Sequence, residues 1–161
     1  MGIIHPHLWY DDNALEAAEF YVSIFPRSRI LSVVEAPAGV PGTTEGAPFI
    51  VRYELDGQLV EAISAGPSQK LDAAFSFVVE CADQEEIDRY WDALLAGGGR
   101  EVACGWLTDR FGLSWQVVPA HLGDLLFGSG DDPAAHARAT AAMLSQTKLD
   151  IAALEAAYRG E

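Results

Sequence analysis

The chain has 161 residues, of which 50% are hydrophobic, so its composition is that of a globular protein rather than a disordered one. A chain of this length buries enough surface to fold without disulfides or a structural metal. Its 24 acidic and 10 basic residues give a formal net charge of −14. Because such a surface repels phosphate backbones, nucleic acid is not an expected partner.

The N-terminal stretch MGIIHPHLWYDD lacks the basic region and the long apolar run of a secretory signal peptide. No apolar stretch in the sequence approaches the roughly 20 residues that a membrane span needs. The two cysteines, Cys81 and Cys104, are too few for a disulfide framework, and both suit the interior of strands. We therefore expect a soluble, cytoplasmic protein that has no membrane partner.

The first predicted element is a strand over residues 3–10, where side chains alternate in character. A helical segment is predicted to follow over 12–25, because apolar residues recur there at helical spacing. Asn13 and Glu16, three residues apart, predict a capping box at its start, and Pro26 predicts its end.

Three strands are predicted next, joined by two different loops. The Pro/Gly-rich segment 36–48 is long enough to be a mobile flap. Asp56-Gly57 is the strongest short signal for a β-hairpin. The predicted strands are 29–35, 48–55 and 58–64.

The same order of elements recurs in the second half of the chain. A strand over 74–81 precedes a helix that begins at Asp83, and Glu86 completes a second capping box. The last hairpin is predicted to turn at Phe111-Gly112, as the earlier one turns at Asp56-Gly57. The strands predicted here are 100–103, 104–109 and 113–118.

The repeat does not predict the last part of the chain, which has three helix-like segments whose apolar faces need a partner surface. These helices pack either back on the domain or against another subunit. Gly128-Ser129-Gly130 and Thr147 separate them. The predicted helices are 121–127, 133–146 and 148–158.

The sequence thus predicts an α+β fold with paired βαβββ modules at about 1–66 and 73–119, forming a domain over 1–119 with a C-terminal helical extension over 120–161. Paired βαβββ modules resemble the vicinal oxygen chelate superfamily, which includes glyoxalases, bleomycin-resistance proteins and extradiol dioxygenases. Within it, the chain is similar to the PhnB-like group, described as 3-demethylubiquinone-9 3-methyltransferase-like. The matching stretches are HLWYDDNALEAAEFYVSIFPRSRI, YELDGQ, SFVVECADQEEIDRYWDALLAGG, CGWLTDRFGLSWQVVP and KLDIAALEAAY.

The resemblance implies that the two modules enclose a cavity, in which a metal, when present, is held by their first and last strands. His7 matches the ligand position of the first strand. Glu61 and Gln116 correspond in the repeat, since each lies four residues after a hairpin glycine. In the fifth strand the equivalent position is near Ala74, with Ser76 next on the same face.

These residues predict a polar ligand pocket rather than a metal centre, because divalent ions favour carboxylates or three protein ligands and Gln116 is neutral. If a divalent metal is the cofactor, His7 and Glu61 are its candidate ligands. Glu61 is also the candidate catalytic residue, since an enclosed carboxylate suits proton transfer. The predicted ligand-binding residues are His5, His7, Trp9, Glu61, Ser76 and Gln116.

Simpler structural roles compete with these assignments. Each histidine could be satisfied by a backbone partner, and Glu61 could face solvent. Trp9 shares the histidine face and is the better pocket candidate, whereas Trp115 is expected beneath a helix. The pattern does not fix the face of Trp106.

Two further motifs have structural interpretations. Gly97-Gly98-Gly99 follows a helix, so it predicts a helix C-cap rather than a nucleotide-binding loop. Asp109-Arg110 lies beside a turn and is expected to be a solvated pair that contributes little.

Two classes of function fit the sequence. The first is a small-molecule-binding protein, assembled as a homodimer because the proteins that it resembles are dimeric. The second is an enzyme of the same superfamily, an isomerase, lyase or transferase that uses Glu61 or a histidine as a base, with or without a metal. Methyl transfer is a third alternative that rests only on the description of the group.

Overall fold

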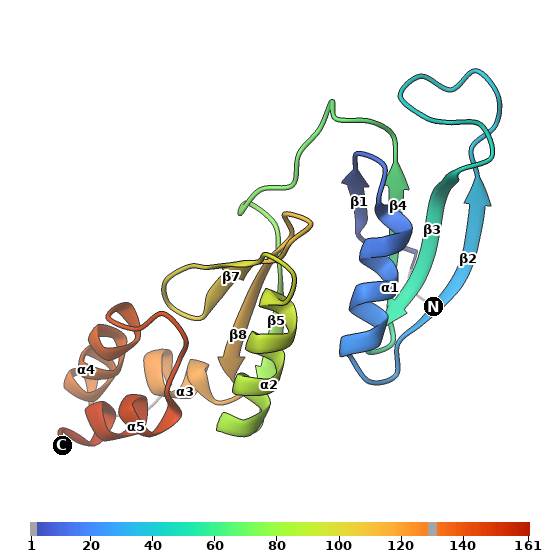
Figure 1. Cartoon of the computed structure of the whole chain (residues 1–161). Coiled ribbons are helices and arrows are strands. Elements are labelled where there is room, and N and C mark those ends of the chain that lie inside the picture. The colour runs from blue at the N-terminus through green and yellow to red at the C-terminus, as the bar shows by residue number, and fades with distance from the viewer. Residues whose placement is uncertain (1–2, 129–131) are drawn as a thin grey trace. The chain divides into compact units, whose positions relative to one another are not determined.

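The computed structural model describes residues 3–128 and 132–161. The chain forms two compact units, residues 1–71 and 72–161. Each unit contains one four-stranded mixed sheet with a helix on one of its faces (Figure 1). The architecture is therefore α+β with two βαβββ arrangements, as the repeat in the sequence predicts.

The first unit consists of β1 (His7–Tyr10), α1 (Ala14–Ile24), β2 (Arg29–Glu35), β3 (Pro48–Leu55) and β4 (Gln58–Ser64). Its strand order is β1-β4-β3-β2, with β1 parallel to β4 and the other neighbours antiparallel. Alternate side chains of three strands are buried with α1 and form the core: Leu8, Tyr10, Val51, Tyr53, Val60 and Ala62.

The second unit repeats this order with β5 (Ser76–Cys81), α2 (Gln84–Leu95), β6 (Arg100–Glu101), β7 (Trp106–Thr108) and β8 (Ser114–Pro119). The strand order is β5-β8-β7-β6, and the parallel pair is again the first strand with the last. The core between α2 and this sheet contains Ile87, Trp91, Leu94, Leu107, Trp115 and Val117.

The chain ends with α3 (Leu122–Phe127), α4 (Pro133–Leu144) and α5 (Ile151–Arg159). These helices belong to the second compact unit and enclose a core that begins at the end of β8. Of the two arrangements left open by the sequence, the structure therefore shows the helices packed on their own unit. The buried members of this core are Val118, Leu125, Leu126, Ala139, Leu149 and Leu154.

The two predicted capping boxes differ in outcome. The prediction for Asn13 is wrong: its side chain makes no cap hydrogen bond, and the hydroxyl of Ser64 on β4 accepts the Ala14 N–H instead, at 3.0 Å. A side chain from the adjacent sheet thus replaces the local cap. At the second site Asp83 accepts the Glu86 N–H at 2.9 Å, as expected.

The predicted strands extend beyond the observed ones at three places. Residues 3–6 are not in a strand, because pairing with β4 begins where the Glu61 N–H donates to the Pro6 carbonyl. β5 begins at Ser76 rather than at residue 74. Cys104 and Gly105 form a turn with φ of +61° and +81°, so Cys104 does not lie inside a strand.

The glycine run and the hairpin agree with the sequence. Gly97 has a φ of +82°, and the Gly99 N–H donates to the Leu95 carbonyl, so the run ends α2. Asp56 and Gly57 have φ of +48° and +84°, the left-handed pair that a two-residue hairpin turn needs.

The separator Gly128-Ser129-Gly130 lies partly outside the described residues. In the described part of the chain, no helix combines the length and the apolar character needed to cross a membrane.

Candidate ligand-binding faces of the two sheets

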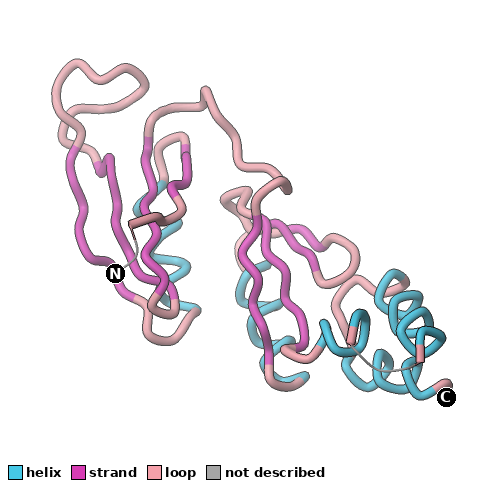
Figure 2. The backbone as a smooth tube through the Cα atoms, turned by 180° about the vertical axis from the view of Figure 1, so that it is seen from behind, coloured by secondary structure: helices cyan, strands magenta, loops and turns pink. Residues whose placement is uncertain are grey.

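In each unit one face of the sheet carries the helix, and the opposite face carries no helix of that unit (Figure 2). We call these opposite faces the helix-free faces. In the first sheet, Leu8 is buried on the α1 side, so His7 and Trp9 lie on the helix-free face. The register pairs His7 with Glu61 and Glu61 with Arg52, so these three side chains form a row across β1, β4 and β3.

Glu61 is the centre of this row and contacts both of its neighbours. Its Oε1 lies 3.4 Å from Nε2 of His7, and its Oε2 lies 3.4 Å from Nε of Arg52. The Glu61 side chain is 23% exposed, whereas His7 and Arg52 are 43% and 44% exposed. The row thus places a possible hydrogen-bond donor on each side of one acceptor.

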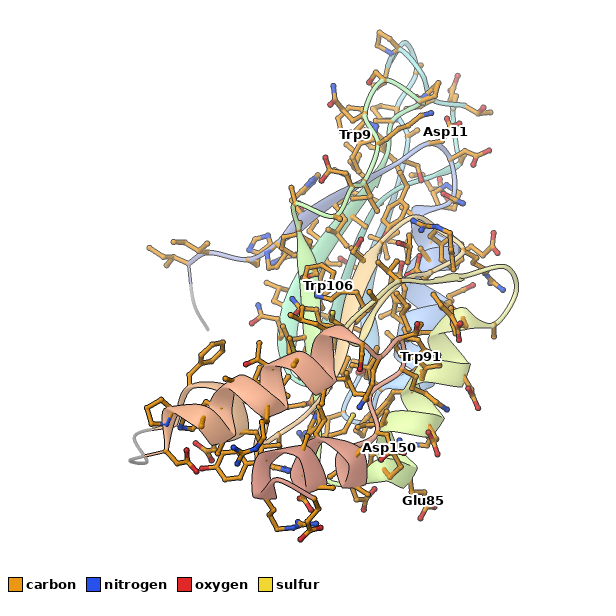
Figure 3. All side chains as sticks on the ribbon, turned by 90° about the vertical axis from the view of Figure 1, so that its left-hand side faces the viewer. Trp9, Asp11, Glu85, Trp91, Trp106 and Asp150 are labelled. Carbon is orange, nitrogen blue, oxygen red and sulfur yellow. The ribbon has the colours of Figure 1, made fainter. Side chains whose placement is uncertain are left out.

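An apolar row runs beside the charged one on the same face. Trp9 is paired in register with Ile63, and Ile63 with Ile50. The indole Nε1 of Trp9 donates to the Gly66 carbonyl at 2.8 Å, which anchors the ring at the end of β1 (Figure 3). All three side chains are half-buried. The face thus combines a charged row with an adjacent apolar surface.

His5 is half-buried and precedes β1. The strand alternation that predicted a common face for His5 and His7 therefore does not reach His5. The structure brings His7 and Glu61 together, and it places Trp9 one row away from them on the same face.

The helix-free face of the second sheet carries the corresponding row without charges. Gln116 is paired in register with Val78 on β5 and with Trp106 on β7. The counterpart of His7 is therefore Val78, which corrects the expectation of a position near Ala74. The register also assigns Trp106 to the helix-free face, which the sequence left open (Figure 3).

Ser76 and Gln116 are in contact on this face. The Nε2 of Gln116 donates to Oγ of Ser76 at 3.0 Å. Because one amide donor is used in this way, the side-chain carbonyl of Gln116 is left to accept a hydrogen bond. This pair, with Trp106 beside it, makes a neutral polar surface rather than an ion-binding one.

Sequence reasoning missed Arg52, although a signal for it was present. In a two-residue hairpin, residues at equal distances from the turn face one another across the strands. Counting outward from Asp56-Gly57 places Arg52 opposite Glu61, and this is the observed pairing.

Asp109 is not the solvated residue that was predicted. It is 4% exposed and accepts the indole N–H of Trp115 at 2.8 Å and the backbone N–H groups of Phe111 and Leu113. Its carboxylate holds the turn between β7 and β8 together. Trp115 is buried on the α2 side of the sheet, as expected.

The described side chains of the two rows do not offer the ligand set of a metal site. Among the described residues, no three His, Cys, Asp or Glu side chains are grouped so that they could hold an ion. In the first sheet the guanidinium of Arg52 already contacts Glu61, so a cation there would meet an adjacent positive charge. In the second sheet the row contains only a neutral amide and apolar side chains.

Residues 3–118 match the model of the 3-demethylubiquinone-9 3-methyltransferase family. The chain belongs to this family. Through it the chain is a PhnB-like member of the vicinal oxygen chelate superfamily, with the glyoxalase/bleomycin-resistance-like fold. The family match ends within β8, so the C-terminal helices lie beyond it.

Solved structures agree with this family assignment. A PhnB protein from Bacillus cereus, described as a 3-demethylubiquinone-9 3-methyltransferase, is 28% identical, with a TM-score of 0.65 over 73% of this chain and 99% of its own. Protein PA1353 from Pseudomonas aeruginosa is 20% identical, with a TM-score of 0.61 over 74% and 98%.

A more distant neighbour shares the fold alone. A variant of the fosfomycin resistance protein FosX from Listeria monocytogenes, complexed with Mn(II) and a dihydroxypropylphosphonic acid, is 13% identical, with a TM-score of 0.53 over 74% and 91% of the two chains. Among curated proteins none matches this chain.

Proposed function

We propose that this PhnB-like protein binds a small oxygenated molecule on the helix-free face of its first sheet. The observation that carries the proposal is the row of His7, Glu61 and Arg52. In this row the carboxylate of Glu61 contacts an imidazole on one side and a guanidinium on the other. A protein of net charge −14 has few basic groups, and this row holds one of them beside an acceptor.

The chemistry of the two rows suggests what the ligand looks like. Arg52 and His7 donate hydrogen bonds to a carboxylate or another oxyanion, and Glu61 accepts one from a hydroxyl group. The adjacent Trp9 and Ile63 supply an apolar surface for a flat or aliphatic body. A ligand with a polar end and an apolar body fits both rows. Enclosure of that ligand by the paired modules remains part of the proposal.

Calorimetry with matched compounds tests this function. Benzoate, salicylate, benzamide and benzyl alcohol share one ring and differ in their polar groups. We expect salicylate and benzoate to bind more tightly than benzamide and benzyl alcohol, and Arg52→Met to remove the difference. Equal affinities for the charged and neutral compounds, or none for any of them, would contradict the proposed site.

An enzyme of the same superfamily is the second candidate, and one observation favours it. A carboxylate 3.4 Å from an imidazole on an exposed face can accept a proton and hold the ring in one orientation. Glu61 is the catalytic candidate in this case. Turnover that is lost in Glu61→Gln and in His7→Ala, while binding persists in both, would identify the enzyme.

Methyl transfer is the third candidate, because the family description names it. The connections from strand to helix carry Asp11-Asp12 and Asp83 instead of the glycine-rich turn of the common S-adenosylmethionine fold, which speaks against this candidate. Calorimetric titration with S-adenosylmethionine tests this candidate, and tight binding would favour it over the first two.

We also propose a cytoplasmic homodimer. Two observations support it: both cysteines are free, and β2 is an edge strand that exposes Leu31, Val33 and Val34. An exposed apolar edge strand favours pairing with a second copy. Light scattering on the wild type and on Val34→Lys measures this, since the substitution places a charge at the edge and should yield monomer.

A further inference from the structure

The C-terminal extension lies beyond the family match, and besides its packing on Val118 of β8 it contacts the sheet of the second unit at a further place. That place is the turn between β6 and β7, residues 103–106. The Cys104 N–H donates to the Gln146 carbonyl and the Gly105 N–H to the Thr147 carbonyl, both at 2.8 Å. Turn N–H groups that would otherwise meet solvent are thus bonded to the segment between α4 and α5.

The turn is also held from its other side. The Gly105 carbonyl accepts the Val117 N–H at 2.8 Å. A Cβ at Gly105 would lie 2.9 Å from the Val117 carbonyl and 3.0 Å from Cδ1 of Leu149, so β8 and the extension both close on this glycine. Leu149 itself is fully buried. The turn therefore has no room to shift while Leu149 is in place.

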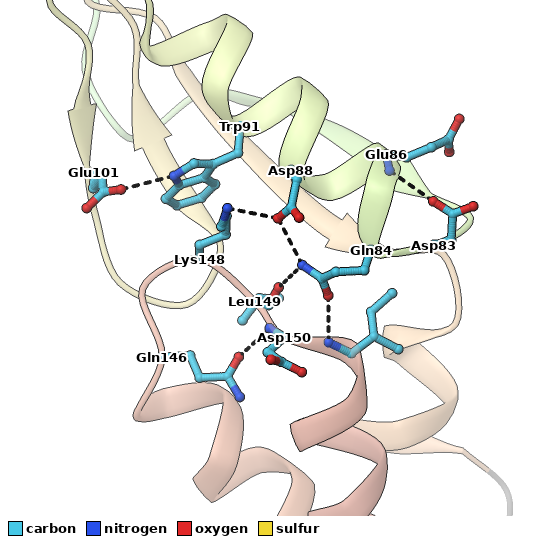
Figure 4. Close-up of polar contacts among 11 residues, drawn as sticks. Asp83, Gln84, Glu86, Asp88, Trp91, Glu101, Gln146, Lys148, Leu149 and Asp150 are labelled. Carbon is cyan, nitrogen blue, oxygen red and sulfur yellow. Dashed lines mark hydrogen bonds and ion pairs between the residues drawn. The ribbon is translucent and has the colours of Figure 1, made fainter.

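The extension is anchored in turn on α2, as Figure 4 shows. The amide of Gln84 donates to the Leu149 carbonyl at 3.1 Å and accepts the Ile151 N–H at 3.0 Å. Lys148 Nζ lies 2.8 Å from Oδ1 of Asp88. These contacts fix the segment relative to the helix that covers the opposite face of the sheet.

The residues adjacent in sequence to Gly105 and Val117 belong to the neutral row on the helix-free face of the second sheet. Trp106 follows Gly105, Gln116 precedes Val117, and the two are paired in register. We propose that the segment 146–149 positions this row: Leu149 and the Gln146 and Thr147 carbonyls hold the turn in the conformation that places Trp106 beside Gln116. The importance of that row for a ligand rests on the proposed function, whereas the positioning does not.

Nuclear magnetic resonance of the ligand-free chain tests the positioning. In Leu149→Ala we expect the indole and backbone signals of Trp106 and the side-chain amide of Gln116 to move or broaden. We also expect the Gly105 amide to exchange about tenfold faster or more, because its hydrogen bond opens locally. Leu149→Met, which refills the space, should restore the wild-type signals.

Leu154→Ala is the matched control. Leu154 is as buried as Leu149 and belongs to the same core cluster, but it lies on α5, outside the segment 146–149. It should lower the stability of the extension and leave the signals of Trp106 and Gln116 in place. If Leu149→Ala leaves those signals unchanged, or if Leu154→Ala moves them equally, the positioning role is wrong.

A second variant covers the case in which Leu149→Ala does not fold. Gln84→Ala removes two of the three contacts with α2, leaves that between Lys148 and Asp88, and opens no core cavity, so it should move the Trp106 signals in the same direction. Unchanged signals in this variant would likewise overturn the proposal. The resonance measurement uses the ligand-free chain, so a negative result would reject the positioning role alone. A failure to bind the aromatic probes would instead reject the proposed function.

Discussion

Glu61 and Gln116 occupy the same register position in the two sheets. Each lies on the last strand of its unit, between one partner on the parallel first strand and one on the antiparallel neighbour. The two sheets therefore have the same position on the last strand, with a charged carboxylate in the first and a neutral amide in the second. In the first sheet it organises an ionic row, and in the second sheet it organises a neutral one.

This relationship predicts the effect of making the first row resemble the second. Glu61→Gln keeps the shape and removes the carboxylate that contacts both neighbours, so His7 and Arg52 lose the group that orients them. Since these contacts are partly exposed, the free energy of unfolding should change by no more than about 1 kcal/mol. Binding of salicylate should weaken about tenfold or more, because the hydroxyl group of salicylate loses its charged acceptor, the Glu61 carboxylate. Urea denaturation and calorimetry measure the two effects.

Glu54→Gln is the control for that substitution. Glu54 is 20% exposed and pairs with Arg29 at 2.9 Å on the same sheet, but outside the row. The charge change is identical, so binding of salicylate should be unaffected. An equal change of binding in both variants would mean that the contacts of Glu61 within the row do not govern affinity.

Asp109→Asn should destabilise the second unit by about 2–3 kcal/mol, because the new amide group would face the indole N–H of Trp115 and leave buried donors unsatisfied. Urea denaturation of the variant measures the loss. In a double-mutant cycle with Trp115→Phe, the combined loss should be smaller than the sum of the single ones. A purely additive cycle would show that the hydrogen bond contributes nothing.

The two cysteines should differ sharply in reactivity. Cys81 is fully buried, and burial, with the nearby carboxylate of Glu86 as a lesser cause, raises the pKa of its thiol to about 12. At pH 8 only roughly one thiol in ten thousand would then be ionised. Iodoacetamide should modify the half-buried Cys104 and leave Cys81 intact until urea is added. Mass spectrometry of the labelled peptides measures the order of modification. Modification of Cys81 before Cys104 would contradict this prediction.

The contact between Lys148 and Asp88 gives the extension a defined pH dependence. The hydrogen bond from Lys148 lowers the pKa of Asp88 below its ordinary value of 3.8, so that stabilisation is lost as the pH falls through the lowered pKa. Asp88 raises the pKa of Lys148 above 10.5, so the stabilisation is also lost as the pH rises through that raised pKa. The pair therefore acts between these limits.

Lys148→Met should accordingly be less stable than the wild type near neutral pH, and the two should converge as the pH falls through the lowered pKa of Asp88 and as it rises through the raised pKa of Lys148. Thermal unfolding across this range, at low and high salt, measures the difference. A stability difference that stayed constant through both limits would assign the effect of Lys148 to packing instead of charge.

Much of the fold could be predicted because the local signals agree with tertiary pairing. β2, β3 and β4 have the predicted bounds, since Asp56-Gly57 fixes both the turn and the register. The N-cap of α1 could not be predicted, because Ser64, distant in sequence, replaces Asn13. Strand ends were overextended where pairing, rather than pattern, decides the boundary.

The candidate site was predictable in part for the same reason. The contact of His7 with Glu61 and that of Ser76 with Gln116 follow from periodicity and hairpin position. Val78 was missed because a parallel strand pair has no turn from which to count its register. The burial of Asp109 depends on three donors that only the folded turn brings together.

The central claim is that the charged row of the first sheet contacts a small molecule. The most direct measurement is a two-dimensional resonance spectrum of the isotopically labelled chain before and after addition of a deproteinised cell extract. We predict that the signals of His7, Trp9, Glu61 and Ile63 shift, and that Glu61→Gln abolishes these shifts. Shifts confined to α3–α5 or to the α1 side of the sheet, or no shifts at all, would contradict the account.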